Sequence, residues 1–534
     1  MMMGDSLLFI ESNVNAKICP GDTIASVAER NGIFIDQPCA GKGNCGKCRV
    51  LVEKNAPCPT DKEKRLLSEQ ELISGIRLAC QAAAVGGMEV KVVDKIPQKV
   101  QILDSVDRAN FNEEYTGQSD LAVAIDIGTT SLVAYLIDKL TGNVIATVSS
   151  MNPQAVFGAD VISRISSIEE DPSNLPKMQH SLVSEINSMM AKLLTKDRSI
   201  YCHVNTFVAA GNSTMEHIFA GISPACIGRA PFAPAFYEAP KLYASDVGID
   251  LKNTVALKLL PNISGFVGGD IVSGIVYSGM AKSKQLSLLI DIGTNNEMVL
   301  GNSEHMLCCS AAAGPALEGA KISCGMRAAS GAIEKAWREN GDIKVKTIYD
   351  APVEGICGSG LVDVIAFMID EGIIRPNGKF ANIEDIDAPA LAKRLTGVRA
   401  AEHLFVLAEK KGRFIGMTQK DIREFQLAKA AIKTGIELML AESDFSIDDI
   451  DNIYLAGAFG SYMDISNAIK TGLLPNVPLS KITPIGNSSG LGACRFAVAD
   501  GLWTLADYVR KNTAHMELAT HKDFQSKFIK NLEF

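Results

Sequence analysis

Four cysteines near the N-terminus carry the clearest chemical signal in this chain. Cys39, Cys45 and Cys48 follow one another as C-x5-C-x2-C, and Cys80 comes after a long gap. Four thiolates are the ligand set that an iron–sulfur cluster requires. The loop between them is rich in glycine, which suits a backbone that must turn sharply and direct N–H groups at sulfur. We therefore expect these cysteines to bind a [2Fe–2S] cluster.

A zinc site or a disulfide pair is the alternative for the same cysteines. Zinc ribbons usually show two short C-x2-C knuckles, whereas this sequence has one. Disulfides need an oxidising compartment, and no feature of the sequence points to one. The spacing differs from that of plant-type ferredoxins by one residue, in its first interval. These comparisons favour the cluster.

Two segments further along the chain have matching sequences. Residues 121–130 and 286–295 are apolar runs that end in Asp-Ile-Gly-Thr, beginning at Asp126 and Asp291. A Gly-Thr turn after a strand offers backbone N–H groups and hydroxyls to phosphate oxygens. An aspartate at the strand end holds Mg²⁺ through water or orients an attacking water. We expect the phosphate-lining residues to be Gly128, Thr129, Thr130, Gly293, Thr294 and Asn295.

Further glycine turns support a nucleotide site in a duplicated fold. Residues 456–460 follow a predicted strand at 453–455, and residues 485–490 follow another short strand. Residues 355–361 have the pattern of a turn that opens a helix. Two phosphate loops, each on its own strand, predict two related halves with a nucleotide between them.

The elements that must position these residues follow from hydrophobic patterning. In the N-terminal part we expect strands at 6–12, 49–53 and 88–93, and helices at 23–30 and 68–74, the first closed by Asn31-Gly32. From residue 121, apolar strands alternate with helices, which is typical of α/β proteins. The predicted domains are a cluster domain (1–95), a linker (96–120), lobe I (121–285), lobe II (286–510) and a C-terminal tail (511–534).

Composition narrows the class of protein. The chain has 534 residues, of which 47% are hydrophobic, so two to four domains with large cores are expected. The net charge of -9 argues against general nucleic-acid binding. The first residues lack a basic segment followed by an apolar one, and no apolar run reaches the roughly 18 residues that span a bilayer. We expect a cytoplasmic protein without a membrane segment.

The motifs resemble those of two known folds. The N-terminal order, with the cysteine loop after the first helix, resembles the β-grasp ferredoxin fold, an α+β domain. The second part resembles the α/β fold of the superfamily of acetate and sugar kinases, heat-shock chaperone ATPases and actin. Residues 126–130 and 291–295 match its two phosphate motifs, and residues 456–460 match its adenosine-side motif. The resemblance implies that Gly457 and Ala458 lie near the adenosine, with Gly486 as a further candidate.

The fusion of these parts resembles the reductive activators of corrinoid proteins. Residues 210–215, 260–270 and 313–320 are similar to segments of that family's ATPase region. The resemblance implies that ATP, Mg²⁺ and the [2Fe–2S] cluster act together to return an inactive Co(II) corrinoid to Co(I). The implied partners are a corrinoid methyltransferase protein and an electron donor such as a reductase or a ferredoxin, and a homodimer is implied as well.

Other functions are compatible with parts of the sequence. One is a small-molecule kinase with a redox-sensing domain, although no separate sugar-binding motif is visible. Others are an activator of another low-potential metalloenzyme and an electron-transfer adaptor with a degenerate ATPase core, which the intact Asp126 and Asp291 argue against. Cys308, Cys309, Cys324 and Cys357 have irregular spacing, which favours core cysteines over a second cluster.

Overall fold

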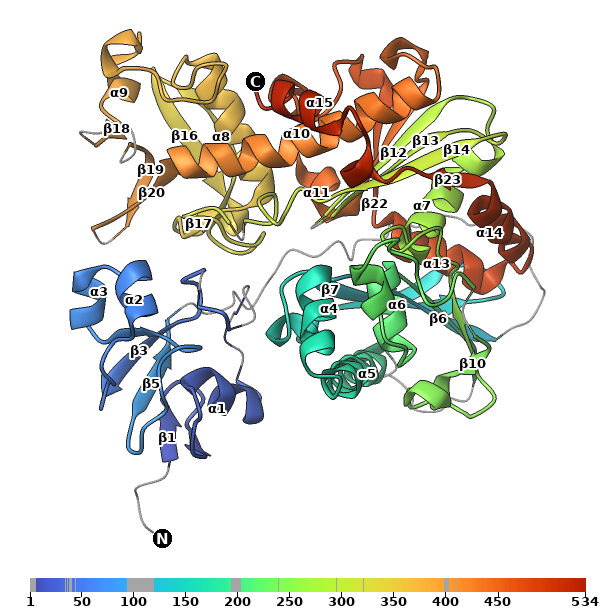
Figure 1. The fold of residues 1–534 in the computed structure, drawn as a ribbon, viewed down its shortest axis with the longest axis horizontal. Helices are drawn as coiled ribbons and strands as arrows, with labels where there is room; N and C mark the ends of the chain where they lie inside the picture. Colours follow the sequence, from blue (N-terminus) through green and yellow to red (C-terminus); the bar gives the residue numbers. More distant parts are fainter. Residues whose placement is uncertain are drawn as a thin grey trace. The chain divides into compact units, whose positions relative to one another are not determined.

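The structure is a computed structural model that describes residues 6–33, 35, 37, 41–43, 45–93, 120–193, 203–238, 240–293, 295–319, 321–397, 403–410 and 412–534. Its residues form two compact units, Met1–Gln98 with Asn152–Ser181 and Lys99–Met151 with Leu182–Phe534. Figure 1 follows the chain through the elements of both units.

The first unit is built on a five-stranded sheet with the strand order β2-β1-β5-β3-β4. Its elements are β1 (Ser6–Phe9), β2 (Val14–Lys17), α1 (Ile24–Arg30), β3 (Arg49–Lys54), α2 (Asp61–Leu66), α3 (Glu69–Ile73), β4 (Ile76–Leu78) and β5 (Glu89–Val92). The β1 and β5 strands pair in parallel, and the other neighbours are antiparallel. Leu7, Ile24 and Val50 are buried in one core that joins the sheet to α1. The predicted α+β domain is confirmed.

Helix α1 begins one residue after the predicted start, with Thr23 as its cap, and ends at the predicted residue, Arg30. The Thr23 hydroxyl accepts a hydrogen bond from the Ser26 backbone N–H at 3.2 Å, and the Ser26 hydroxyl accepts one from the Thr23 N–H at 3.0 Å. This reciprocal cap satisfies N–H groups that have no partner inside the helix. After Arg30 the chain leaves the helix through Gly32, whose φ of 67° is left-handed. Glycine adopts that conformation at little cost, which explains the stop.

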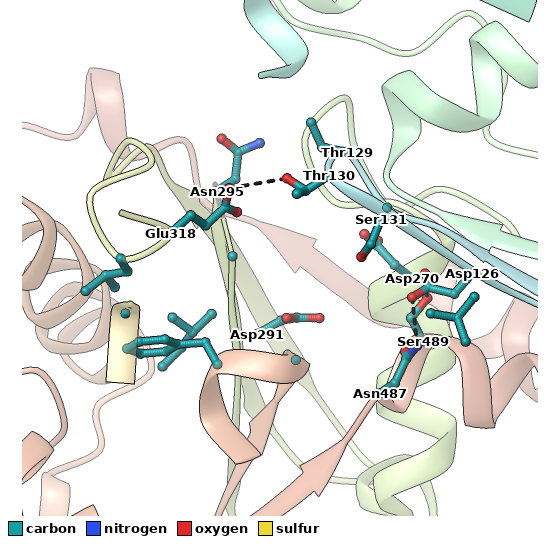
Figure 2. A pocket seen from close by; sticks show the side chains of 18 of the residues that line it. Asp126, Thr129, Thr130, Ser131, Asp270, Asp291, Asn295, Glu318, Asn487 and Ser489 are labelled. Carbon is teal, nitrogen blue, oxygen red and sulfur yellow. Dashed lines mark hydrogen bonds between the residues drawn. The ribbon is translucent and has the colours of Figure 1, made fainter. Parts of the chain in front are cut away.

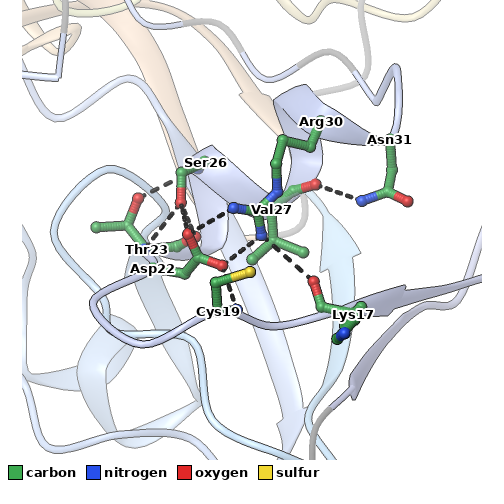
Figure 3. Close-up of polar contacts among 8 residues, drawn as sticks. All are labelled: Lys17, Cys19, Asp22, Thr23, Ser26, Val27, Arg30 and Asn31. Atoms are coloured by element: carbon green, nitrogen blue, oxygen red, sulfur yellow. Dashed lines mark hydrogen bonds and ion pairs between the residues drawn. The ribbon is translucent and has the colours of Figure 1, made fainter.

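An ion pair ties the turn before α1 to the end of the helix (Figure 3). Asp22 accepts hydrogen bonds from the Cys19 backbone N–H at 2.6 Å and from the Arg30 guanidinium Nη1 at 2.9 Å. Arg30 also donates from Nη2 to the Lys17 carbonyl at 3.3 Å. The Arg30 guanidinium is the main reason that the pKa of Asp22 falls to about 2. The contact therefore persists across the neutral range.

A helical segment, residues 152–181, completes the first unit. It contains the 3₁₀ helix η1 (Pro153–Val156), α4 (Val161–Glu170) and the start of α5 (Asn174–Leu193). The fully buried Arg164 donates from Nε to the Gly158 carbonyl at 3.0 Å and from Nη1 to Gln154 Oε1 at 3.1 Å. Gln154 in turn donates to the Met178 carbonyl at 3.1 Å. This buried network links the three helices.

The second unit contains two six-stranded sheets. The first has the order β10-β11-β9-β6-β7-β8, with β6 (Leu121–Ile127), β7 (Ser131–Asp138), β8 (Val144–Met151), β9 (Val204–Gly211), β10 (Leu242–Tyr243) and β11 (Ala256–Leu259). The second has the order β22-β21-β12-β13-β14-β23, with β12 (Ser287–Ile292), β13 (Asn296–Gly301), β14 (Met306–Ala311), β21 (Asn452–Ala456), β22 (Ile482–Gly486) and β23 (Thr513–His515).

The two sheets repeat one arrangement of strands. In the first, β6 is antiparallel to β7 and parallel to β9; in the second, β12 is antiparallel to β13 and parallel to β21. Asp126 lies opposite Ala210 of β9, and Asp291 lies opposite Ala456 of β21. The two aspartates thus hold equivalent places in equivalent sheets. This topology confirms the predicted duplicated α/β fold.

Helices and smaller sheets surround the two sheets (Figure 1). The helices are α6 (Ser213–Phe219), α7 (Gly269–Ser278), α8 (Gly358–Asp370), α9 (Pro389–Ala392), α10 (Gln419–Glu442), α11 (Gly457–Tyr462), α12 (Ile465–Lys470), α13 (Ser488–Val498), α14 (Gly501–Asn512) and α15 (Phe524–Lys530). The smaller sheets contain β15 (Ala332–Glu339), β16 (Asp342–Thr347) and β17 (Gly355–Ile356), and β18 (Leu395–Thr396), β19 (Leu404–Lys410) and β20 (Arg413–Thr418).

Two helices, α7 and α13, link the two sheets. Helix α13 follows β22 of the second sheet but packs against β6 and β9 of the first sheet and against α7. Glycine at position 274 permits the close approach, because a Cβ there would lie 3.0 Å from the Ser488 hydroxyl oxygen. Ser273 donates its hydroxyl to the Ser489 carbonyl at 2.6 Å across the same contact. The start of α13 is therefore fixed against the first sheet.

Two sequence expectations differ from the observed elements. The predicted strand at 6–12 ends at Phe9, because residues 10–13 form the turn that leads into β2 and Asn13 adopts a φ of 53°. Residues 511–534, predicted to be a C-terminal tail, are packed into lobe II. Their strand β23 pairs with β14, and Asn531 donates to the Thr434 hydroxyl of α10 at 3.1 Å.

Among the described residues, no helix is long and apolar enough to cross a bilayer.

Removing the cap of α10 should weaken the second unit. The Thr418 hydroxyl accepts from the Asp421 backbone N–H at 3.2 Å, and the Asp421 carboxyl accepts from the Thr418 N–H at 2.9 Å. Thr418→Ala removes one half of this cap, and we expect the free energy of unfolding to fall by about 1 kcal/mol. In urea, the unfolding midpoint of Thr418→Ala should be lower than that of Lys420→Ala, which changes an exposed residue in the same helix turn. Equal midpoints for the two variants would contradict the assigned cap.

Candidate functional site

A cavity of about 300 Å³ lies at the ends of β6 and β12, in the second unit (Figure 2). Its walls include the residues that follow both strands and the first turns of several helices. The lining residues predicted from the sequence are Asp126, Gly128, Thr129, Thr130, Asp291, Gly293, Asn295 and Gly457. Cavities of this size are typical of small-molecule sites. The two phosphate loops therefore do meet at one site.

The first phosphate loop is a tight turn fixed by its neighbours. The Gly128 N–H donates to the Ser131 carbonyl at 3.0 Å, and a Cβ on Gly128 would lie 2.7 Å from that oxygen. Thr129 accepts a hydrogen bond from the Asn212 side-chain amide at 2.9 Å. Thr130 donates its hydroxyl to Glu318 at 3.3 Å. These contacts hold the loop in place, with its hydroxyls at the cavity.

The second phosphate loop is described in part. The Gly293 N–H donates to the Asn295 carbonyl at 3.2 Å, which closes a tight turn after β12. Asn295 lines the cavity. Thr294, predicted to line the phosphates, lies outside the described residues.

Asp126 is held by two side chains from the far end of the sequence. Its Oδ1 accepts from the Ser489 hydroxyl at 2.7 Å, and its Oδ2 accepts from the Asn487 amide at 2.9 Å. Figure 2 shows both at the start of α13. Burial raises the pKa of Asp126 to about 6, and the two hydrogen bonds oppose that rise. The carboxyl group is thus fixed in direction at the cavity wall.

Three further carboxyl groups stand near Asp126. Burial, followed by the charge of Asp126, raises the pKa of Asp291 to about 7. Asp270, in the first turn of α7, has a pKa raised to about 8 by burial and then by Asp291. Burial, then Asp270 and Asp291, raise the pKa of Glu297 well above its usual range. Asp126 acts on Asp270 and Asp291, and the charges of Asp270 and Asp291 act on Glu297. The group is therefore electrostatically coupled.

This group suits a hydrated magnesium ion. Among the described residues, no three His, Cys, Asp or Glu side chains are close enough to bind a metal directly. Magnesium keeps several of its waters, however, and usually takes one or two carboxylates together with substrate phosphates. Asp126 and Asp291 at the cavity wall fit that requirement. The carboxyl groups would then contact the ion's waters.

The residues predicted to lie near the adenosine differ in their relation to the cavity. Gly457 lines the cavity with a φ of 86°, and a Cβ there would lie 3.0 Å from Asp291 Oδ1. Ala458 lies in α11, and its side chain is outside the described part of the structure. Gly486 does not line the cavity; the next three residues, 487–489, do. The strand β22 ends at Gly486, so the following helix start faces the site.

Several lining residues were missed from the sequence. Asp270 and Glu297 supply two of the four carboxyl groups, and Asn487 and Ser489 orient Asp126. Asn487 caps α13 by accepting from the Gly490 N–H at 2.8 Å. An Asn-x-x-Gly pattern before an apolar helix is the signal that marks such a cap. No local pattern marks Glu297, whose place depends on strand register.

The cysteine loop of the first unit is the second site. The Cys48 and Cys80 sulfurs lie 3.3 Å apart, too far for a disulfide bond of about 2.05 Å. The Gln81 amide donates to the Cys80 sulfur at 3.3 Å and to the Gly41 carbonyl at 2.8 Å. The contact with Cys80 and burial raise the pKa of the Cys48 thiol. A thiol in that setting becomes a thiolate when a metal coordinates it.

The loop around these cysteines has the shape expected of a cluster cradle. Gly41, Gly43 and Gly46 have φ values of 74°, 69° and 69°, which other residues rarely adopt. A Cβ on Gly43 would lie 2.5 Å from the Gln81 side chain. Cys45 is half-buried in the same loop, and Cys39 lies outside the described residues. Three of the four predicted ligands are thus described, and their setting fits the cluster.

Of the four cysteines considered for a second cluster, Cys324 is half-buried and the other three lie in cores. Cys308 and Cys309 are adjacent in β14, so their side chains enter opposite faces of the sheet and different cores. Cys357 is buried and donates to the Ile333 carbonyl at 3.1 Å. This arrangement supports the interpretation of core cysteines and gives no common site for a second cluster on these three residues.

Replacing a cluster ligand should remove the cluster's visible absorption. We expect Cys39→Ala, Cys45→Ala, Cys48→Ala and Cys80→Ala each to lose it, because a cluster needs all four thiolates. Cys58→Ala, which changes an exposed cysteine of the same unit, should keep the wild-type spectrum and about two irons per chain. An intact cluster in one of the four variants would remove that cysteine from the ligand set.

Comparison with known proteins agrees with both sites. Residues 9–85 match the 2Fe-2S iron-sulfur cluster binding domain, residues 121–283 the RACo middle region, and residues 285–534 the C-terminal domain of RACo, the ASKHA domain. The corrinoid activation enzyme RamQ of Eubacterium limosum is 31% identical over 99% of this chain and 98% of its own. A Methanosarcina barkeri protein, the [Co(II) methylated amine-specific corrinoid protein] reductase, is 28% identical over 51% of each chain.

A solved structure extends the likeness to three dimensions. The reductive activator for corrinoid,iron-sulfur protein is 29% identical, covers 99% of this chain and 98% of its own, and superposes with a TM-score of 0.69. Sequence, fold and both sites lead to one conclusion: the chain belongs to the family of reductive activators of corrinoid proteins, in which a [2Fe–2S] domain is joined to an ASKHA-type ATPase core.

Proposed function

We propose that this protein uses Mg²⁺ and ATP to drive the reduction of a partner corrinoid protein from Co(II) to Co(I), with the electron supplied by its [2Fe–2S] cluster. The observation that supports this most is the presence of both sites in one chain. The thiol groups of Cys48 and Cys80 converge in the first unit, and a cavity lined by both Gly-Thr turns and their strand-end aspartates lies in the second. Relatives that share this organisation over their full length are activators.

Asp126 and Asp291 have distinct roles in this proposal. Both oxygens of Asp126 accept hydrogen bonds, so this carboxyl group is a fixed anchor for the ion's waters. Within the described part of the chain, no donor forms a hydrogen bond with the Asp291 carboxyl, which leaves its oxygens to orient an attacking water. In this proposal the phosphates contact Gly128 and Thr129 of the first loop and Gly293 and Asn295 of the second, all of which line the cavity.

The need for ATP follows from the reduction potentials of the cluster and of the corrinoid. A ferredoxin-type [2Fe–2S] cluster has a potential of about −400 mV, and Co(II) corrinoids are harder to reduce. Each 100 mV of deficit for one electron corresponds to roughly 2.3 kcal/mol. Coupling between two sites of a protein typically supplies about 1–3 kcal/mol. Nucleotide binding and hydrolysis in the cavity can therefore change the affinity for the corrinoid partner enough to offset such a deficit.

The partners are proposed by their chemistry. The substrate is a corrinoid protein of a methyltransferase system, and a reductase or a ferredoxin reloads the cluster. We also propose a homodimer and a cytoplasmic location, where a reducing environment keeps the cluster thiolates available.

The direct test of this function is an anaerobic reduction assay. Reduced protein is mixed with the Co(II) form of a corrinoid protein encoded near its gene, and the Co(I) absorption band is followed with and without Mg²⁺ and ATP. We expect Co(I) only when both are present. ATP hydrolysis with an intact cluster and no Co(I) would contradict the proposal and favour a small-molecule kinase.

Removing the charge of Asp291 should stop hydrolysis while leaving the cluster in place. Asp291→Asn keeps the shape of the side chain but removes its negative charge and its ability to take a proton from water. ATP turnover should therefore fall by about 10²-fold or more. The visible spectrum should match the wild type, since the cluster lies in the other unit. Asp448→Asn, an exposed aspartate of the second unit, is the matched control. Normal turnover by Asp291→Asn would rule out its catalytic role.

A further inference from the structure

Gln81 directly follows the fourth predicted cluster ligand, and its side chain lies against the sulfur of that ligand. Its amide Nε2 donates to Cys80 Sγ at 3.3 Å, to the Cys80 carbonyl at 3.1 Å and to the Gly41 carbonyl at 2.8 Å. The amide nitrogen carries two hydrogens, so one is directed at Gly41 while the other is shared between the sulfur and the carbonyl of Cys80. One side chain therefore contacts both segments of the cysteine site.

A glycine in the cysteine loop leaves the space that this amide occupies. A Cβ on Gly43 would lie 2.5 Å from Gln81 Cδ and 2.7 Å from its Nε2. Gly43 also has a φ of 69°, a conformation that other residues rarely adopt. A larger residue at this position would displace the amide from Cys80. The loop is thus shaped around the Gln81 side chain.

The backbone of the segment that carries Gln81 is fixed as well. The Leu78 N–H donates to Oε1 of the fully buried Glu63 at 2.8 Å. The Ala79 N–H donates to the Cys48 carbonyl at 2.8 Å. The Gln81 N–H donates to the Leu78 carbonyl, also at 2.8 Å. These bonds hold the turn around the fourth ligand in one conformation, so the amide is already in place beside the sulfur.

A hydrogen bond to a ligand sulfur acts differently on the two redox states of an iron–sulfur cluster. Reduction adds an electron and makes the sulfurs more negative, and a donor binds more strongly to a more negative acceptor. Hydrogen bonds to the sulfurs are among the features that set the reduction potentials of such clusters. A donor at Cys80 therefore favours the reduced state over the oxidised one.

We propose that Gln81 raises the reduction potential of the [2Fe–2S] cluster by donating a hydrogen bond from its side-chain amide to the Cys80 sulfur. This inference rests on the proposed function and adds a residue to the electron-transfer site. A higher potential makes it easier for the electron donor to reduce the cluster. The electron then needs more energy to pass on to Co(II), and that is the step that ATP drives in the proposed function.

A redox titration of the full chain with its cluster tests this effect. Gln81→Met keeps an unbranched side chain of similar length but has no N–H group. At a fixed solution potential near the midpoint, we expect its ratio of reduced to oxidised cluster to be about 3- to 10-fold lower than in the wild type, because a hydrogen bond to a charged group is lost. A tenfold change corresponds to about 59 mV for a one-electron couple. Visible absorption measures the ratio.

Two further variants and a spectrum separate the hydrogen bond from other effects. Gln81→Glu, measured at a mildly alkaline pH, puts a negative charge beside the sulfur, so its potential should fall further than that of Gln81→Met. Gln70→Met makes the matched change at an exposed glutamine of α3 and should keep the wild-type potential. In resonance Raman spectra, the iron–sulfur stretching bands should shift less between H₂O and D₂O in Gln81→Met than in the wild type, because an exchangeable N–H at sulfur is lost.

The remaining outcomes contradict the inference. A wild-type potential in Gln81→Met would show that the amide does not act on the cluster. Loss of the cluster from both Gln81 variants, with Gln70→Met intact, would show that Gln81 serves to hold the loop at Gly41. A wild-type chain that titrates normally but yields no Co(I) in the reduction assay would contradict the proposed function and not this inference, so the two failures are distinguishable.

Discussion

The repulsion among carboxyl groups in the cavity is the constraint on which the account of the ATP site depends. Burial raises the pKa values of Asp126, Asp270, Asp291 and Glu297, and neighbouring carboxyl groups raise those of the last three further. Such a group is unfavourable unless a cation or protons compensate it. In the proposed function, Mg²⁺ bound with ATP supplies that cation at the phosphate loops. The folded protein thus contains a site that is stabilised by the ligand it is built to bind.

The duplicated fold explains how these groups come together. The two central strands, β6 and β12, each end in an aspartate and a glycine turn, and each has a parallel neighbour on one side and an antiparallel neighbour on the other. Helix α13 then crosses from the second sheet to the first and brings Asn487 and Ser489 to Asp126. A shift of one sheet relative to the other would change these contacts directly. This gives a physical route from nucleotide state to a change in conformation.

Much of the architecture could be predicted because it depends on local pattern. The glycine turns after apolar strands located Asp126, Asp291 and Gly457 at the cavity, and the alternation of elements predicted the α/β core. The cysteine spacing indicated the cluster loop, whose Cys48 and Cys80 sulfurs converge.

The residues that escaped prediction are those whose place depends on tertiary structure. Glu297 reaches the site only through the register between β12 and β13, and Ser489 only through a contact with Asp126 across 363 positions of sequence. Gly486 was expected at the site, but it is the last residue of β22, and the three residues that follow it line the cavity instead. The C-terminal residues were expected to be a tail, yet pairing of β23 with β14 makes them part of the second sheet.

The central claim is that the ATP site controls an electron transfer that it does not itself perform. The most direct measurement is the yield of Co(I) per reduced cluster in a single turnover of Asp126→Asn, with Mg²⁺, ATP and the corrinoid partner present. The account predicts a fully reduced cluster, a wild-type spectrum and little or no Co(I). A wild-type yield and rate of Co(I) from this variant would contradict the account, because the cluster would then reduce cobalt without a working ATP site.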